Sequence, residues 1–164
     1  MTDHEDLQAR AGAMEQTIRT NFDGCNEADE GKMAACFADD AVHYFPAGMP
    51  DAPWRGAATI AARWAHLVAT QGSAWSIDRM VVDPASRQAV IEWTHYKTAV
   101  GKLLRGDEWY VFDERGLITE IRAYYASPAA PQPDALGLAG FDYAGRGYRT
   151  TAPVDRPAPR APGA

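Results

Sequence analysis

Four strand-like segments follow one another between residues 74 and 125, and this run constrains the fold more than any other feature of the sequence. The segments are AWSIDRMVVD, QAVIEWTHYKTA, LLRGDEWYVF and LITEIRAYY, which are rich in β-branched and aromatic residues. Only the short turns PASR, VGK and DERG separate them. Connections of this length join antiparallel neighbours, so we expect a consecutive antiparallel meander.

The residues before this run favour helices. Apolar side chains recur at helical spacing and predict an amphipathic helix over residues 5–27: Leu7, Ala11, Met14, Ile18, Phe22 and Cys25. We expect Asp29 to cap a second, short helix, and Asp39 and Asp40 to form a turn before the strand VHYFPAG. WRGAATIAARWAHLVATQG predicts a third helix that Gly72 closes. Because helices and strands are segregated along the chain, we predict an α+β domain with a strongly curved antiparallel sheet packed on N-terminal helices.

The last predicted hairpin, residues 105–125, carries charged residues among aromatic ones. Gly116 suits the left-handed position of a three-residue loop, which opposes Asp113 to Leu117. Counting back along both strands places these pairs on one face: Phe112 with Ile118, Tyr110 with Glu120, Glu108 with Arg122, and Gly106 with Tyr124. The other face then carries Trp109, Ile121 and Tyr125. A slip of one residue would exchange the two faces.

Composition limits the class of protein. The chain has 164 residues and is 46 % hydrophobic, which suits one domain. A net charge of -6 without a lysine or arginine cluster argues against nucleic acid as a partner. The polar start MTDHEDLQAR and the lack of a long apolar run argue against a signal peptide and a membrane span, so we expect a cytoplasmic protein. Cys25 and Cys36 lack metal-site spacing, and we expect both to be buried free thiols.

The C-terminal composition shifts to proline and alanine. We therefore expect a domain over residues 1–126, an extension over 127–150 and a disordered tail over 151–164. Within the extension, FDYAGRGYR has three aromatic residues and two arginines, which favours docking on the domain or on a partner subunit. If this segment covers a pocket mouth, Arg146 is a candidate contact for an anionic substrate group.

Three stretches together resemble the SnoaL-like branch of the nuclear transport factor 2-like superfamily: CNEADEGKMAACFADDAV, the WRG that opens a helix, and RGLITEIRAYY. The likeness covers about residues 8–126. It implies a cone-shaped fold with a deep pocket inside the curved sheet, and frequent dimerisation through the outer side of the sheet. The superfamily contains isomerases, cyclases, dehydratases, epoxide hydrolases, lyases and non-catalytic members, so fold alone leaves the activity open.

The resemblance can be checked position by position. Where ketosteroid isomerases have a catalytic aspartate and a first-helix tyrosine, this chain has Phe45 and Asn21. Where limonene epoxide hydrolases have an Asp-Arg-Asp triad, it has His95, Trp93 and Ala126. Neither mechanism carries over. With the hairpin register above, the pocket wall would contain His43, Phe45, Trp93, His95, Glu108, Tyr110, Arg122 and Tyr124, with Trp54 near the mouth.

These residues suggest a cofactor-independent enzyme without a metal, a lyase or isomerase that includes elimination and retro-aldol cleavage among its candidate reactions. His95 would be the general base, Glu108 and Arg122 would orient substrate or stabilise developing negative charge, and Tyr124 or Tyr110 would donate a proton. The substrate would be a small hydrophobic, oxygenated compound of aromatic, polyketide or terpenoid type. Two alternatives remain, namely a non-catalytic binding or dimerisation module and an epoxide-opening hydrolase. Each residue also has a purely structural interpretation, as a core histidine, an architectural ion pair or a packing aromatic.

Overall fold

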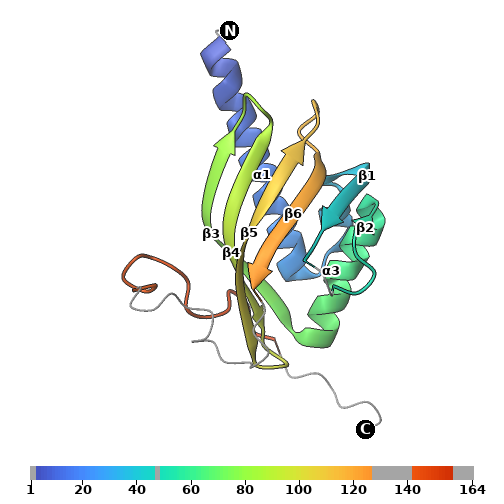
Figure 1. The fold of residues 1–164 in the computed structure, drawn as a ribbon, viewed down its shortest axis with the longest axis vertical. Coiled ribbons are helices and arrows are strands. Elements are labelled where there is room, and N and C mark those ends of the chain that lie inside the picture. The colour runs from blue at the N-terminus through green and yellow to red at the C-terminus, as the bar shows by residue number, and fades with distance from the viewer. Residues whose placement is uncertain (1–2, 47–48, 127–141, 157–164) are drawn as a thin grey trace.

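The computed structural model describes residues 3–46, 49–126 and 142–156, which form helices, a curved sheet and a C-terminal segment (Figure 1). The helices are α1 (Asp3–Glu27), α2 (Glu30–Ala34) and α3 (Ala57–Gln71). The strands are β1 (Phe37–Tyr44), β2 (Trp54–Arg55), β3 (Ser73–Asp83), β4 (Gln88–Lys97), β5 (Lys102–Phe112) and β6 (Ile118–Ala126). Within these residues, none of the helices combines the length and the apolar character needed to cross a membrane.

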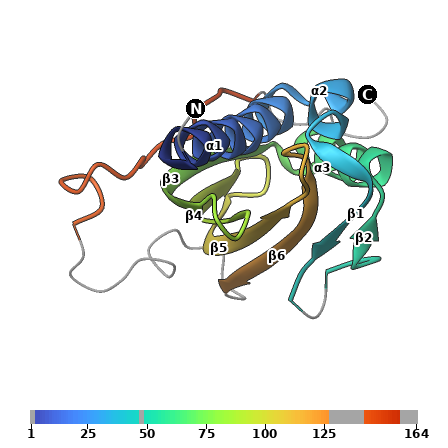
Figure 2. The ribbon, with the colours of Figure 1, turned by 90° about the horizontal axis from the view of Figure 1, so that it is seen from above.

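The strands form one sheet in the order β2-β1-β6-β5-β4-β3. β3 to β6 pair antiparallel in chain order, which confirms the predicted meander. β1 lies parallel to β6, so the sheet is mixed and the expectation of a wholly antiparallel sheet was wrong for this pair. No short turn joins β1 to β6, and nothing in the connection therefore imposes the antiparallel direction. Figure 2 shows the sheet curling around α1 and α3 without closing.

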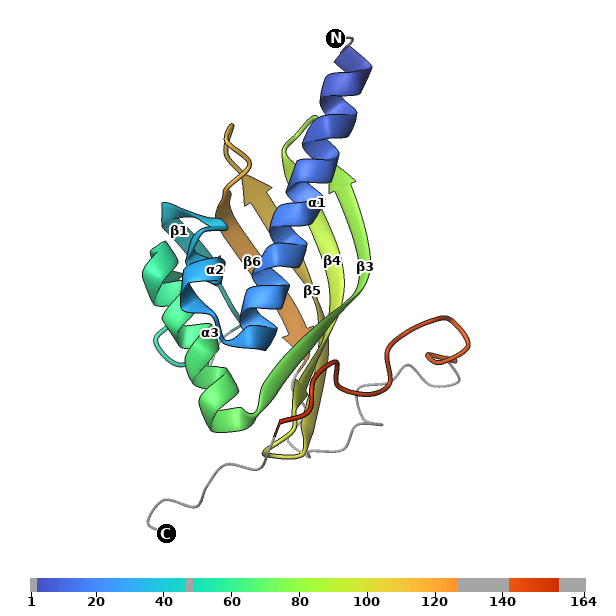
Figure 3. The ribbon, with the colours of Figure 1, turned by 180° about the vertical axis from the view of Figure 1, so that it is seen from behind.

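The N-terminal helices cover the concave face of the sheet (Figures 2 and 3). Met14, Ile18, Phe22 and Cys25 of the predicted apolar stripe are buried on α1. Asp29 caps α2 as predicted, because its side chain accepts a hydrogen bond from the Lys32 amide at 2.9 Å. Both cysteines are buried and free, which confirms that prediction.

Two boundaries differ from the sequence analysis. Asp39 and Asp40 lie inside β1 rather than in a turn, exposed at the stretch where the pairing of β1 with β6 shifts register. Trp54 and Arg55 pair with β1 as β2, so α3 begins only at Ala57. Gly56 precedes it at a φ of 88°, a conformation outside the helical region. Gly72 ends α3 in the left-handed conformation, as predicted.

The loop of the last hairpin forms as predicted, but the register beyond it does not. The Asp113 amide donates to the Leu117 carbonyl at 2.9 Å, and Phe112 faces Ile118. The register then shifts, and Val111 faces Glu120. A β-bulge of this kind adds one residue to one strand and moves every later pair by one position. The expected pairing of Glu108 with Arg122 was therefore wrong.

The bulge exchanges the two faces of β6. Glu108 now faces Ala123, and Trp109 faces Arg122. Ile121 and Tyr125, which we expected on the outer face, line the interior instead. Trp109 is on the outer face as expected and is 41 % exposed.

The C-terminal segment packs on the outer side of β3 to β5. The Tyr148 hydroxyl donates to Glu92 at 2.6 Å, and the Tyr96 hydroxyl donates to the Arg149 carbonyl at 2.8 Å. The Arg105 guanidinium lies 4.1 Å from the centre of the Tyr143 ring. Glu92 and Tyr96 alternate along β4 with the inward Trp93 and His95, which places the segment on the face opposite the interior.

The segment continues to residue 156 of the described chain. Arg156 donates to the backbone carbonyls of Ser73 and Asn26, at 2.6 and 2.5 Å. This contact joins the end of the described chain to the start of β3 and the last turn of α1. Residues 151–156 of the tail that we expected to be disordered thus include an anchored arginine, and residues 157–164 lie outside the described residues.

Candidate functional site

A pocket of about 610 Å³ lies between the concave face of the sheet and helices α1 and α3. Its size is in the range of small-molecule sites. The buried Asn21, His43 and Tyr110 line its inner part, whereas the exposed Pro50 and His66 lie at its opening. Pro50 and α3 therefore border the opening on one side, and the partly exposed Lys97 at the end of β4 also lines the pocket.

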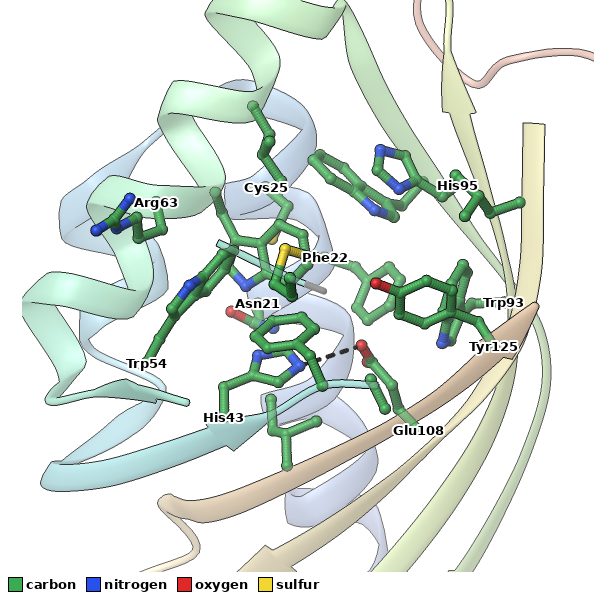
Figure 4. A pocket seen from close by; sticks show the side chains of 18 of the residues that line it. Asn21, Phe22, Cys25, His43, Trp54, Arg63, Trp93, His95, Glu108 and Tyr125 are labelled. Carbon is green, nitrogen blue, oxygen red and sulfur yellow. Dashed lines mark ion pairs between the residues drawn. The ribbon is translucent and has the colours of Figure 1, made fainter. Parts of the chain in front are cut away.

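Three polar side chains meet in the inner part. Glu108, with a side chain only 7 % exposed, places Oε1 3.5 Å from Nε2 of His43. The Tyr110 hydroxyl donates to the other carboxylate oxygen, Oε2, at 2.5 Å. Figure 4 shows His43 and Glu108 pointing toward one another from β1 and β5. We call Glu108, His43 and Tyr110 the inner cluster.

The charge of Glu108 influences the acids around it. Burial, and then the negative charge of Glu108, raise the pKa of the Tyr110 hydroxyl well above its usual value. The same two causes raise the pKa of Tyr125 and, well above its usual value, that of the Cys25 thiol. These groups therefore keep their protons at neutral pH, and Tyr110 and Cys25 donate hydrogen bonds, to Glu108 and Met33.

Several polar atoms of the inner pocket have no hydrogen-bond partner in the described protein. They are Oδ1 of Asn21, Nε1 of Trp93, and both ring nitrogens of His43. The 3.5 Å contact to Glu108 is too long to satisfy Nε2 of His43. A buried polar group without a partner costs about 1–3 kcal/mol, so such atoms gather where a protein binds something polar.

His95 occupies a different part of the same wall. Its Nε2 lies 2.8 Å from the Ser73 hydroxyl, and its ring stacks on Trp75 with centroids 4.5 Å apart. Burial, and then the charge of Lys97, hold the pKa of His95 well below its usual value. His95 is therefore neutral at physiological pH, with one nitrogen already bonded within the fold.

Aromatic rings surround the inner cluster. His43 stacks on Phe45 at 4.0 Å, and Trp54 and Trp64 meet edge to face at 5.2 Å. Gly106 lies opposite Trp93 on the neighbouring strand. A Cβ on Gly106 would come within 2.9 Å of the Trp93 ring, so glycine at this position leaves room for that wall.

Seven predicted site residues line the pocket: His43, Phe45, Trp54, Trp93, His95, Glu108 and Tyr110. Three do not. Arg122 and Tyr124 lie on the outer face because of the bulge, where Arg122 pairs with Glu120 at 3.1 Å and Tyr124 is 61 % exposed. Arg146 lies in the C-terminal segment, and its carbonyl accepts a hydrogen bond from Arg79 at 2.6 Å.

Other residues that line the pocket were not predicted from the sequence. Asn21 interrupts the apolar side of α1 between Ile18 and Phe22, and a polar residue at such a position was an available signal. Tyr125 required the correct register of β6. Lys97 follows His95 by two positions on β4, so the alternation of the strand would have placed it inward.

Among the residues that the structure describes, no three histidine, cysteine, aspartate or glutamate side chains are grouped closely enough to hold a metal ion. The chemistry that the described pocket can perform itself is proton transfer and hydrogen bonding in an aromatic enclosure.

Comparisons with known proteins agree with this architecture. The sequence model of the SnoaL-like domain family matches residues 18–121. No curated protein matches the chain. A crystal structure of a protein of unknown function with a cystatin-like fold, from Methylobium petroleophilum, is 57 % identical and has a TM-score of 0.70. The match covers 90 % of this chain and 97 % of that one.

Two more distant structures share the fold and contain or were designed for small ligands. RV0760c from Mycobacterium tuberculosis, in complex with estradiol-17beta-hemisuccinate, is 17 % identical with a TM-score of 0.61 and covers 70 % of this chain and 94 % of its own. A computationally designed 17-OHP binder is 20 % identical with a TM-score of 0.57 and covers 68 % and 90 %. At these identities the similarity concerns the fold.

Proposed function

Because the chain belongs to the SnoaL-like domain family, we propose that it is a lyase or isomerase that works by general acid–base catalysis with its own side chains on a small hydrophobic, oxygenated compound. The observation that carries the proposal is the inner cluster. A carboxylate that is almost fully buried faces a histidine whose nitrogens have no hydrogen-bond partner in the described protein. This is an arrangement that folding alone does not favour.

In this proposal Glu108 accepts the proton. Tyr110 holds one carboxylate oxygen, so the other, Oε1, is the atom that can take a proton from a carbon next to a carbonyl group. His43, next to Oε1, donates a hydrogen bond to the oxygen on which negative charge develops and can return a proton to the product. Asn21 and Trp93 supply further polar atoms that orient the substrate.

His95 keeps a role in this proposal, but a smaller one than the sequence suggested. Its low pKa makes it a weak base, and Ser73 already occupies Nε2. We propose that its ring and that of Trp75 form the wall along which the apolar body of the substrate lies.

A general base can be detected before the natural reaction is known. An enzyme that removes a proton next to a carbonyl in D₂O exchanges that proton for deuterium even when no net reaction follows. We would incubate the protein in D₂O with a panel of aromatic and polycyclic ketones and measure deuterium incorporation by mass spectrometry. The exchange rate of Glu108→Gln should be at least about a hundredfold lower than that of the wild type.

Glu120→Gln is the matched control, because it makes the same charge change on the same hairpin but on the outer face. It should exchange like the wild type. Equal exchange by wild type and Glu108→Gln would remove Glu108 from the mechanism. A panel in which ligands bind without any exchange would favour the second candidate function.

That second candidate is non-catalytic binding of a small hydrophobic molecule. The observation in its favour is the aromatic enclosure, in which the ring centroids of Phe45, Trp54 and Trp64 lie within 6.0 Å of one another. Because the two distant structures are a complex with estradiol-17beta-hemisuccinate and a designed 17-OHP binder, we would include these two compounds in the panel.

We also propose that the protein is a homodimer that uses the outer face of β5 and β6. Trp109 and Tyr124 are 41 % and 61 % exposed there, and the Arg122 guanidinium lies 5.8 Å from the centre of the Trp109 ring. Burying two aromatic rings in each subunit would stabilise such an interface. Sedimentation at micromolar concentration should give a dimer, and Trp109→Ser should shift it toward monomer. A monomeric wild type would contradict the proposal.

A further inference from the structure

The charged side chains that line the pocket are unevenly distributed. Glu108 lies in the inner part, whereas the two cationic side chains, Arg63 and Lys97, are both partly exposed. Arg63 is already paired, because its guanidinium donates to Asp51 at 2.7 Å. Figure 4 shows Arg63 on the helix side, away from Glu108. Lys97 is therefore the lining cation whose charge requires an explanation.

Lys97 has cationic and neutral neighbours but no anionic partner in the described part of the chain. It lies at the end of β4, two residues beyond His95 and opposite Lys102 and Ser73 on the adjacent strands. Burial, and then the charge of Lys102, lower the pKa of Lys97. Half-burying an ammonium group beside another ammonium is unfavourable unless an anion joins it.

We propose that the pocket takes an amphipathic ligand that carries an anionic group, such as a carboxylate or sulfonate, and that Lys97 binds this group near the pocket opening. The inference rests on the proposed function and names the substrate class. The negative charge of Glu108 repels an anion from the inner part of the pocket, while the positive charge of Lys97 attracts the anion to the outer part. The two charges together orient the ligand, with the anionic group outward and the reacting carbon next to Glu108.

Such an orientation is useful to an acid–base enzyme. The wall from Lys97 runs inward along β4 past His95 to Trp93, which are alternate residues of one strand face. An apolar body that follows this wall bridges the distance between the anionic group and the inner cluster. Binding energy obtained at Lys97 then positions atoms that react elsewhere in the pocket.

A matched pair of fluorescent probes tests the charge preference. The anionic 1-anilinonaphthalene-8-sulfonate and the neutral N-phenyl-1-naphthylamine share their ring system and differ by the sulfonate. Four of the five tryptophans line the pocket, and Trp109 does not. In a Trp109→Phe background all the tryptophan donors therefore line the pocket, and energy transfer is most efficient to a probe that is bound there.

Lys97→Gln should weaken binding of the sulfonate probe by about fivefold or more and leave the neutral probe within about twofold. Lys102→Gln is the control, since Lys102 is the exposed cross-strand neighbour of Lys97 and does not line the pocket. It should change the binding of either probe by less than about twofold, because an exposed charge is screened by solvent.

The outcomes separate this inference from the function on which it rests. If the neutral probe binds and Lys97→Gln affects both probes equally, the preference for an anion is wrong, while the pocket remains a binding site. An equal loss in Lys97→Gln and Lys102→Gln would likewise overturn the inference, because it would indicate general surface charge. If neither probe accepts energy from the pocket tryptophans, neither probe binds in the pocket, and this outcome would contradict both the inference and the proposed function.

Discussion

His43 and His95 line the same pocket, yet the fold treats them in opposite ways. His95 has a hydrogen-bond partner in Ser73 and a stacking partner in Trp75. His43 is more deeply buried, at 1 % exposure, and neither of its nitrogens has a hydrogen-bond partner in the described protein. The difference teaches that burial alone does not identify a reactive histidine. The group that folding leaves without a partner is the better candidate.

The largest expected effect concerns activity at His43. His43→Phe removes the donor next to Glu108 and keeps an aromatic ring against Phe45. We expect the deuterium-exchange rate to fall by about a hundredfold or more, the usual contribution of an acid–base group. His95→Phe should lower it by less than about tenfold. The reverse order would show that His95, and not the inner cluster, removes the proton.

The order of the two variants should reverse for stability, because His95→Phe should destabilise the fold more than His43→Phe does. His95→Phe leaves the fully buried Ser73 hydroxyl without its partner and should cost about 1–3 kcal/mol in urea unfolding. His43→Phe removes buried nitrogens that have no hydrogen-bond partner in the described protein, so the free energy of unfolding should stay the same or rise, by up to about 1–3 kcal/mol. Adding Ser73→Ala to His95→Phe should restore part of the loss. If Ser73→Ala restores none of the loss, the broken hydrogen bond to Ser73 is not the reason why His95→Phe destabilises the protein.

A third prediction concerns pH. Because burial lowers the pKa of His95 in the folded protein, the unfolded chain, with a pKa near 6.5, takes up this proton first as the pH falls. The stabilisation from neutral His95 is therefore complete above about pH 6.5 and is lost below it, at a limiting slope of about 1.4 kcal/mol per pH unit.

The matched measurement is the difference between wild type and His95→Phe. Other groups cancel in that difference, including Asp78, whose pKa burial raises and which therefore favours the folded state as the pH falls. The difference in unfolding free energy should shrink between about pH 7 and pH 5. A constant difference would mean that His95 titrates alike in both states.

The smallest expected effect lies on the outer face, where the C-terminal segment packs. Tyr148→Phe removes the hydrogen bond to Glu92 and should cost about 0.5–1.5 kcal/mol in urea unfolding. The exchange rate should stay unchanged, because the segment contacts the face opposite the pocket. Tyr44→Phe, at a tyrosine that is 39 % exposed, serves as the control. A loss of exchange in Tyr148→Phe would indicate that the segment does affect the pocket.

The sequence predicted the pocket walls where strands are regular. Alternation along β4 and β5 correctly placed Trp93, His95, Glu108 and Tyr110 inward, because no irregularity interrupts the pairing of these two strands. The α1 stripe followed from helical periodicity in the same way.

On β6 the predicted inward and outward positions were wrong, because the strand contains one extra residue. A single bulge near Thr119 exchanges the two faces, which moves Arg122 and Tyr124 outward and Tyr125 inward. Nothing in the alternation of the strand indicates such a bulge. The parallel pairing of β1 with β6 could not be predicted from the sequence either, because the two strands are far apart in the chain and no short turn fixes their relative direction.

The most direct test of the account is the position of a bound ligand. A crystal structure of the protein with a ketone that it deuterates would show which end of the pocket holds the carbonyl group. We expect the carbonyl oxygen within about 3.2 Å of His43 or Asn21 and the exchanging carbon next to Oε1 of Glu108. A carbonyl group held at His95, with the inner cluster untouched, would contradict the claim that the partnerless groups around His43 are the reactive part of the pocket.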